Sequence, residues 1–134
     1  MASRASGSSG ASRGKRKSAK APGRPASDKR AGALLVLSTA PDRATAERIA
    51  GTLVEERLAA CVNIVPGVTS VYRWKGKIER DAEVLCLIKT RGSLLAKLSR
   101  RLTALHPYDV PEVIALRISG GAPPYLKWLM DQTT

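Results

Sequence analysis

The sequence predicts an α+β fold, a ferredoxin-like βαββαβ sandwich with a short C-terminal helix. Two observations lead to this prediction. Short apolar runs typical of strands alternate with segments whose apolar residues recur at the spacing of a helix. A tight turn, Lys75-Gly76, joins two consecutive strands into a hairpin. The resulting order is strand, helix, strand, strand, helix, strand, which is the split-βαβ arrangement.

The first strand and helix lie at the start of the apolar part of the chain. Residues 33–40 form a short apolar run that predicts a buried strand. Pro41-Asp42 breaks the run and opens a helix, which we expect to end near residues 58–60. One apolar stripe along this helix is formed by Ala46, Ile49, Ala50, Leu53 and Val54. The helix therefore packs one face against the sheet.

A long hairpin follows. Residues 61–65 and 68–74 predict one strand, bent or bulged at Pro66-Gly67, and residues 77–89 predict its partner. Arms of this length reach about 40 Å, whereas a domain of this size is about 26 Å across. The tip of the hairpin should therefore project beyond the domain. Because it carries Trp74, an aromatic side chain, we expect it to dock on another subunit.

A second helix is predicted from a cap at Thr90 or Ser93 to His106, where Pro107 stops it. Its apolar face is formed by leucines at helical spacing. They are Leu94, Leu95, Leu98, Leu102 and Leu105.

The last elements are a strand and a short helix. Residues 109–111 form a loop, residues 112–119 a strand, and Pro123-Pro124 opens the final helix. In this fold both long helices cover one face of the sheet and leave the other face bare. Since exposed apolar faces mark interfaces, this is a second argument for an oligomer.

The chain divides into two parts by composition. Residues 1–31 contain no Val, Ile, Leu or aromatic residue, so they cannot bury enough surface to offset the entropy of ordering. We expect residues 1–31 to be a disordered basic tail and residues 32–134 to be one globular domain. The first 30 residues hold nine Lys and Arg but one acid, Asp28, and carry most of the formal net charge of +12.

Three interpretations of the basic tail stay open. It is a solvated extension, an organellar transit peptide rich in Ser, Ala and Arg, or an arm that contacts nucleic acid. The last interpretation is weakened because no aromatic residues interleave with the Lys15–Lys17 run to stack on bases.

Several classes of protein are excluded. No apolar run reaches the length of a membrane span, and the N-terminus lacks the apolar segment of a secretory signal, so we expect a cytoplasmic protein with no membrane partner. Cys61 and Cys86 lack the spacing of a metal or redox motif. The sequence holds no nucleophile elbow, P-loop or dinucleotide fingerprint, so we expect no catalytic residues and no firmly bound cofactor.

Six blocks of the folded part carry a specific signal. They are Ser38–Asp42, Leu58–Ile64, Pro66–Ile78, Glu83–Thr90, Leu105–Glu112 and Tyr125–Leu129. In this order they strongly resemble the CutA divalent-ion-tolerance family, from about residue 34 to residue 130. The resemblance implies a ferredoxin-like subunit in a tight homotrimer whose sheets pack edge to edge around a threefold axis. It also implies tolerance to divalent ions, copper especially, without catalytic activity, and an architecture similar to trimeric PII signalling proteins.

His106 is the best candidate for a metal ligand, because imidazole binds copper and zinc. The alternative is a histidine that ends its helix and bonds the last free carbonyls. Some members of the family have a Cys at the position of Ser38 and a His at that of Leu105. Because this chain lacks both, we expect weak copper binding at most.

Cys61 is the second candidate ligand, as a thiolate or reactive thiol at the start of a strand. The alternative is a small buried side chain. Cys86 lies in the middle of an apolar strand, where we expect it to belong to the core.

The matching blocks also suggest a pocket between subunits that binds a small anion. Lys89 ends a strand shortly before a helix N-terminus, where backbone N–H groups favour anions. The alternative is that the aromatic residues fill the subunit interface and that Lys89 forms an ion pair with Glu112. The residues of this predicted pocket are Trp74, Lys89, Tyr108, Glu112, Tyr125 and Trp128.

The sequence therefore predicts a non-enzymatic trimer that responds to, or weakly binds, divalent metal ions of the copper type. One alternative is a PII-like sensor that binds a small anion between subunits. Another is a trimeric scaffold whose tails bind a polyanion. The cytoplasmic location changes to an organellar one if residues 1–31 are a transit peptide.

Overall fold

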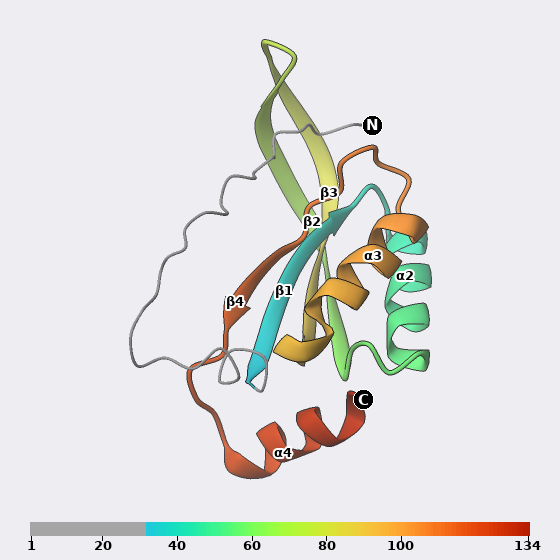
Figure 1. The fold of residues 1–134 in the computed structure, drawn as a ribbon. Helices are drawn as coiled ribbons and strands as arrows, with labels where there is room; N and C mark the ends of the chain where they lie inside the picture. The colour runs from blue at the N-terminus through green and yellow to red at the C-terminus, as the bar shows by residue number, and fades with distance from the viewer. Residues whose placement is uncertain (1–31) are drawn as a thin grey trace, which may run out of the picture.

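The computed structural model describes residues 32–134, so the disordered tail predicted for residues 1–31 lies outside the described residues. Four strands form one antiparallel sheet in the order β2-β3-β1-β4, and α2 and α3 cover one of its faces (Figure 1). This is the predicted α+β, ferredoxin-like arrangement. The elements are β1 (Ala33–Ala40), α2 (Arg43–Glu55), β2 (Cys61–Trp74), β3 (Lys77–Arg91), η2 (Gly92–Leu94), α3 (Leu95–Leu105), β4 (Ile114–Arg117) and α4 (Pro123–Gln132).

The core lies between the sheet and the two long helices. Strands β1 and β3 pair over the whole length of β1, from Ala33↔Arg91 to Ala40↔Val84. The side chains that alternate toward α2 and α3 are buried, and the apolar stripe predicted for α2 packs on them from Ala46 to Leu53. Val54, which we also expected in the stripe, is 41% exposed, because α2 turns this position away from the sheet. The largest fully buried apolar members are Val36, Leu53, Ile88, Leu98 and Leu102.

Helix α2 begins as predicted but ends earlier. The Asp42 side chain accepts a hydrogen bond from the Thr45 backbone N–H at 2.7 Å, which caps the helix. The helix ends at Glu55 rather than near residues 58–60, because Arg57 takes a left-handed conformation with φ 62°. The Leu58 N–H then bonds back to the Leu53 carbonyl at 2.9 Å, and the Leu58 side chain turns into the core.

The predicted cap of the second helix is wrong. Thr90 lies within β3, which continues to Arg91 because β1 pairs with it that far. Its hydroxyl donates to the Leu58 carbonyl at 2.7 Å in a fully buried position. Ser93 lies in η2, and Leu94, the residue before α3, provides no side-chain cap.

The predicted hairpin is present, and its tip extends past the rest of the domain (Figure 1). A bulge interrupts the register between Val65 and Val68, where we expected a bend or a bulge. Gly67 there has φ 80°, which glycine adopts without strain. At the tip, Lys75 and Gly76 both have positive φ, as a two-residue hairpin turn requires.

Strand β4 is shorter than the predicted range 112–119. Only Ile114–Arg117 pair with β1, and all four residues are exposed. The chain then leaves the sheet after one more bond, from the Ile118 N–H to the Ala33 carbonyl at 3.1 Å.

The face of the sheet opposite α2 and α3 is only partly covered. We name it the open face. Helix α4 lies across one end of it, against Lys89 and Arg91, and the remainder is apolar and partly exposed. Its apolar residues are Leu35, Leu37, Val65, Leu85, Leu87, Ile114 and Leu116.

Replacement of Thr90 by Val should lower the free energy of unfolding by about 1–3 kcal/mol. Valine keeps the shape of the side chain but removes the hydroxyl that donates to the buried Leu58 carbonyl. Urea unfolding of the purified chain measures the loss. Thr90→Ser keeps the hydroxyl and is the control, so a Val variant as stable as the Ser variant would contradict this role.

Acidification should remove the contribution of the α2 cap. The hydrogen bonds from Thr45 hold the pKa of the Asp42 carboxyl below its usual 3.8. A carboxyl with a lowered pKa stabilises the fold above its unfolded pKa and loses this contribution as the pH falls through the folded pKa. Thermal unfolding between pH 2 and pH 6 should therefore show a smaller drop for Asp42→Asn, which caps without a charge. Parallel curves for the two proteins would contradict a contribution from the charge of the Asp42 carboxylate to the cap.

Candidate functional site

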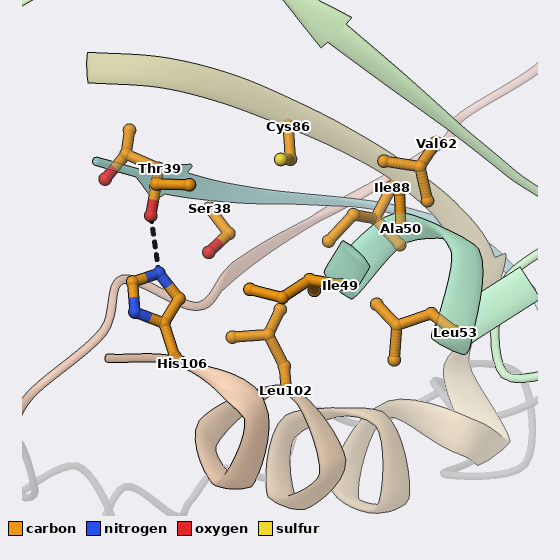
Figure 2. Close-up of a pocket in the computed structure, with 11 residues that line it drawn as sticks. Ser38, Thr39, Ile49, Ala50, Leu53, Val62, Cys86, Ile88, Leu102 and His106 are labelled. Carbon is orange, nitrogen blue, oxygen red and sulfur yellow. Dashed lines mark hydrogen bonds between the residues drawn. The ribbon is translucent and has the colours of Figure 1, made fainter. Parts of the chain in front are cut away.

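A small cavity lies between the sheet and the two long helices, next to the end of β1 (Figure 2). It has room for no more than a water molecule. Its polar side chains are Ser38, Cys86 and His106, Thr39 contributes its backbone carbonyl, and the rest of its lining is apolar. The apolar lining consists of Ala40, Ile49, Ala50, Leu53, Val62, Ile88 and Leu102.

His106 is buried and both of its ring nitrogens are engaged. Nε2 lies 2.7 Å from the Thr39 carbonyl oxygen (Figure 2), and Nδ1 accepts the Tyr108 backbone N–H at 3.1 Å. Since Nδ1 accepts a hydrogen bond, the ring is neutral and Nε2 carries the proton it donates to Thr39. A metal ion would have to displace one of these two partners, so the geometry opposes tight binding at His106.

Cys86 lies directly opposite Ser38 in the β1–β3 ladder, and both side chains face the cavity. Burial raises the pKa of the Cys86 thiol above its usual 9.0, which keeps it protonated and a poor ligand. Sequence reasoning assigned Cys86 to the core, which is correct, but missed that it shares the cavity with His106. Aligning residues 33–40 against residues 84–91 as an antiparallel pair would have revealed this juxtaposition.

Cys61 is remote from His106 within one chain. It is half-buried at the start of β2 and pairs with Lys89, as does Leu35 of β1. Leu35 and Thr39 are four residues apart, so Cys61 and His106 meet the sheet about 13 Å apart along the strands, and β3 lies between them across the sheet. Among residues 32–134 no three His, Cys, Asp or Glu side chains gather to hold a metal ion.

Three residues of the predicted pocket meet where α4 crosses the end of the open face. They are Lys89 on β3 and Tyr125 and Trp128 on α4. The Lys89 ammonium lies 3.2 Å from the Tyr125 hydroxyl and 5.4 Å from the centre of its ring. Tyr125 and Trp128 pack against each other with ring centres 5.4 Å apart, and both are about 40% exposed. Lys89 therefore contacts Tyr125 of its own chain. The ion pair between Lys89 and Glu112, which was the alternative interpretation, is not formed within residues 32–134.

The other three residues lie elsewhere. Tyr108 is buried after α3, where its hydroxyl donates to the buried Glu83 carboxylate and its ring packs on His106 at 4.6 Å. Glu112 lies in the segment before β4, and Trp74 ends β2 at the hairpin tip. A single pocket lined by all six residues therefore requires more than one copy of the chain.

None of the helices in the described part of the chain is long and apolar enough to cross a bilayer.

Comparison with known proteins gives a consistent result. The model of the family described as "CutA1 divalent ion tolerance protein" matches residues 34–132. A divalent-cation tolerance protein CutA from Thermus thermophilus is 54% identical over 99 residues, which are 74% of this chain and 96% of that protein. The crystal structure of CutA1 from Oryza sativa is 51% identical, with a TM-score of 0.76 over 79% of this chain and 97% of that one.

A plant relative is longer than the chain. Protein CutA, chloroplastic, from Arabidopsis thaliana is 51% identical over 107 residues, which are 80% of this chain but 59% of that protein. The chain thus spans less than two thirds of the plant relative and nearly all of the bacterial one. Because the family model matches most of the chain and the relatives are about 50% identical, the chain belongs to the CutA1 divalent ion tolerance protein family.

Proposed function

We propose that the chain is a divalent-cation tolerance protein that acts without catalysis, as a trimer that binds copper-type ions weakly. The proposal rests on the 54% sequence identity with the Thermus thermophilus protein of that name, because the chain covers 96% of that relative. The CutA1 family is one of tolerance proteins rather than enzymes, in agreement with the absence of enzyme motifs in the sequence.

Weak binding is consistent with the cavity. The one sulfur donor beside His106 is the protonated Cys86 thiol, and the imidazole is engaged at both nitrogens. Ser38 offers a neutral hydroxyl where some relatives have a thiol, and Leu105 offers no donor. Cys61 is the other proposed ligand and would act separately, because of its distance from His106.

The two edges of the sheet support assembly into a ring. In a four-stranded antiparallel sheet the edge strands, here β2 and β4, run in opposite directions. The β4 edge of one copy beside the β2 edge of another therefore continues an antiparallel sheet. Such a head-to-tail contact forms a closed ring when the rotation from one subunit to the next divides a full turn evenly. The resemblance to the family implies a ring of three subunits. The apolar open face and the projecting hairpin supply the surface to be buried.

A second function, binding of a small anion between subunits, is favoured by Lys89. Its ammonium contacts Tyr125 and, within residues 32–134, has no carboxylate partner. The positive charge of Lys89 can therefore bind an anion beside the exposed rings of Tyr125 and Trp128. The third function considered, binding of a polyanion by basic tails, depends on residues outside the described part.

The proposed location is the cytoplasm, with import into an organelle as the alternative. Import is supported by the chloroplastic relative from Arabidopsis thaliana and by the Ser-, Ala- and Arg-rich composition of residues 1–31. A solved relative from Archaeoglobus fulgidus is described as periplasmic, so members of the family differ in location.

The metal proposal predicts that the chelator-stripped full chain takes up Cu(II) with a dissociation constant above the micromolar range, as measured by calorimetry and native mass spectrometry. A bacterial strain deleted for its own family member should nevertheless tolerate more copper when it expresses this chain. Tight uptake of one ion per subunit would contradict weak binding. Cys61→Ser and Cys86→Ser would then tell which thiol holds the ion. Unchanged copper sensitivity of the strain would contradict the tolerance function.

The trimer proposal predicts a particle of three times 14.3 kDa by light scattering. Leu116→Glu places a charge on the open face, where the side chain is 51% exposed in one chain, and should dissociate the trimer. Val54→Glu is the matched control, because Val54 is 41% exposed on α2, away from the open face. A wild-type monomer, or equal effects of both variants, would refute this interface.

A further inference from the structure

The outer half of the β2–β3 hairpin is a two-stranded ribbon whose two sides differ in character. On one side every residue is exposed, and we name this side the outer hairpin face. Its residues are Thr69, Val71 and Arg73 of β2 and Ile78, Arg80 and Ala82 of β3. On the opposite side the aromatic residues Tyr72 and Trp74 and the acidic residues Glu79 and Asp81 are half-buried. The ribbon therefore separates its arginines from its acidic and aromatic side chains.

The outer hairpin face continues the side of β3 that packs on the helices further along the strand. Strand β3 runs from Lys77 to Arg91, and its even-numbered side chains point to one side. Ile88 on this side is buried in the core, whereas the outer part of the hairpin extends beyond both helices (Figure 1). Subunits that assemble over the open face bury the other side of the hairpin, which carries Trp74. The same assembly leaves the outer hairpin face pointing outward.

The arginines and the apolar residues of this face alternate like the squares of a checkerboard. Val71 pairs with Arg80, and Arg73 pairs with Ile78. The two arginines are therefore diagonal neighbours, about 7–8 Å apart at the backbone. Val71 and Ile78 occupy the other diagonal and are 54% and 60% exposed.

The positive charges of Arg73 and Arg80 are not compensated within the described part of the chain. Neither guanidinium forms an ion pair with a carboxylate in residues 32–134. The acids nearest in sequence, Glu79 and Asp81, pair with Tyr72 and Ser70 on the opposite side of the ribbon. The face thus presents two positive charges at a spacing fixed by the strand register.

This spacing matches an extended acidic peptide. In an extended chain, side chains two residues apart lie on one side and about 7 Å apart. Two carboxylates at that spacing can each accept two hydrogen bonds from one guanidinium. Val71 and Ile78 exclude water beside the pairs, which reduces the screening that weakens exposed ion pairs. A single-stranded nucleic acid gains affinity by stacking on aromatic rings, but Tyr72 and Trp74 lie on the other side.

We propose that the outer hairpin face docks an extended acidic segment of a partner protein, whose carboxylates at alternate positions contact Arg73 and Arg80. The proposal rests on the proposed trimer for the number of such faces, because rotation about the ring axis brings three of them to one end of the particle. One hairpin holds an acidic segment weakly. A partner with several acidic segments is held more tightly, because its second contact is intramolecular.

Fluorescence anisotropy with the full chain and a labelled peptide of alternating Glu and Thr tests this surface. The double variant Arg73→Gln/Arg80→Gln should weaken binding of the peptide on the order of tenfold. Lys97→Gln/Arg100→Gln is the matched control, since it removes the same charge from exposed positions of α3 and should leave the affinity nearly unchanged. The basic residues 1–31 are present in both variants, so their attraction for the peptide cancels in the comparison. No binding by the wild type, or equal losses in both variants, would overturn the proposal.

A second peptide tests the spacing. It contains the same number of Glu residues at every third position and should bind the wild type several-fold more weakly than the alternating peptide. The two peptides should bind the Arg73→Gln/Arg80→Gln variant alike. Equal affinities for the wild type would refute the match in spacing. A single-stranded DNA that loses more affinity in this variant than the alternating peptide does would make the face a nucleic-acid site and refute a protein partner.

Light scattering of the same samples separates this proposal from that of the trimer. A monomeric wild type whose peptide binding falls in Arg73→Gln/Arg80→Gln would refute the trimer and support the docking surface. A trimer whose peptide binding is unaffected by these substitutions would refute the docking surface alone.

Discussion

The pairing of β1 with β3 is the constraint on which the other features depend. All eight residues of β1 pair with β3 on one side, and Leu34–Leu37 pair with β4 on the other, so β1 and β3 form the centre of the sheet. The register fixes which side chains face α2 and α3 and which face the open side. It sets Ser38 opposite Cys86 in the cavity and Lys89 opposite Leu35 on the open face. A shift by one residue would exchange these two sets.

The two faces of the sheet then serve different purposes. The covered face buries an apolar core and leaves one small polar recess at His106, whose hydrogen bonds join α3 to β1. The other face keeps apolar side chains partly exposed and is closed at one end by α4. The covered face thus gives the fold its stability, and the exposed groups that a partner or ligand could reach lie on the open one.

Much of the fold could be predicted because local signals and packing agree. The run at residues 33–40, the stripe from Ala46 to Leu53 and the Lys75-Gly76 turn each occur where they were expected. The end of α2 was missed because it occurs at Arg57, a non-glycine residue in a left-handed conformation. The role of Thr90 and the short β4 were missed because each depends on a contact between distant segments. The candidate site was less predictable for the same reason. Cys86 and His106 come together only through strand register, and of the six pocket residues only Lys89, Tyr125 and Trp128 meet in one chain.

The bulge at Pro66-Gly67 has a consequence for the outer part of the hairpin. Between Val65 and Val68 the strand advances three residues while its partner advances two, from Leu85 to Glu83. This extra residue shifts the phase of the strand, so even-numbered side chains beyond it occupy the side that odd-numbered ones hold before it. Tyr72 consequently shares a side with Asp81, to which its hydroxyl donates. Deleting one residue from the bulge would turn every side chain of the outer strand to the opposite side, without altering its composition.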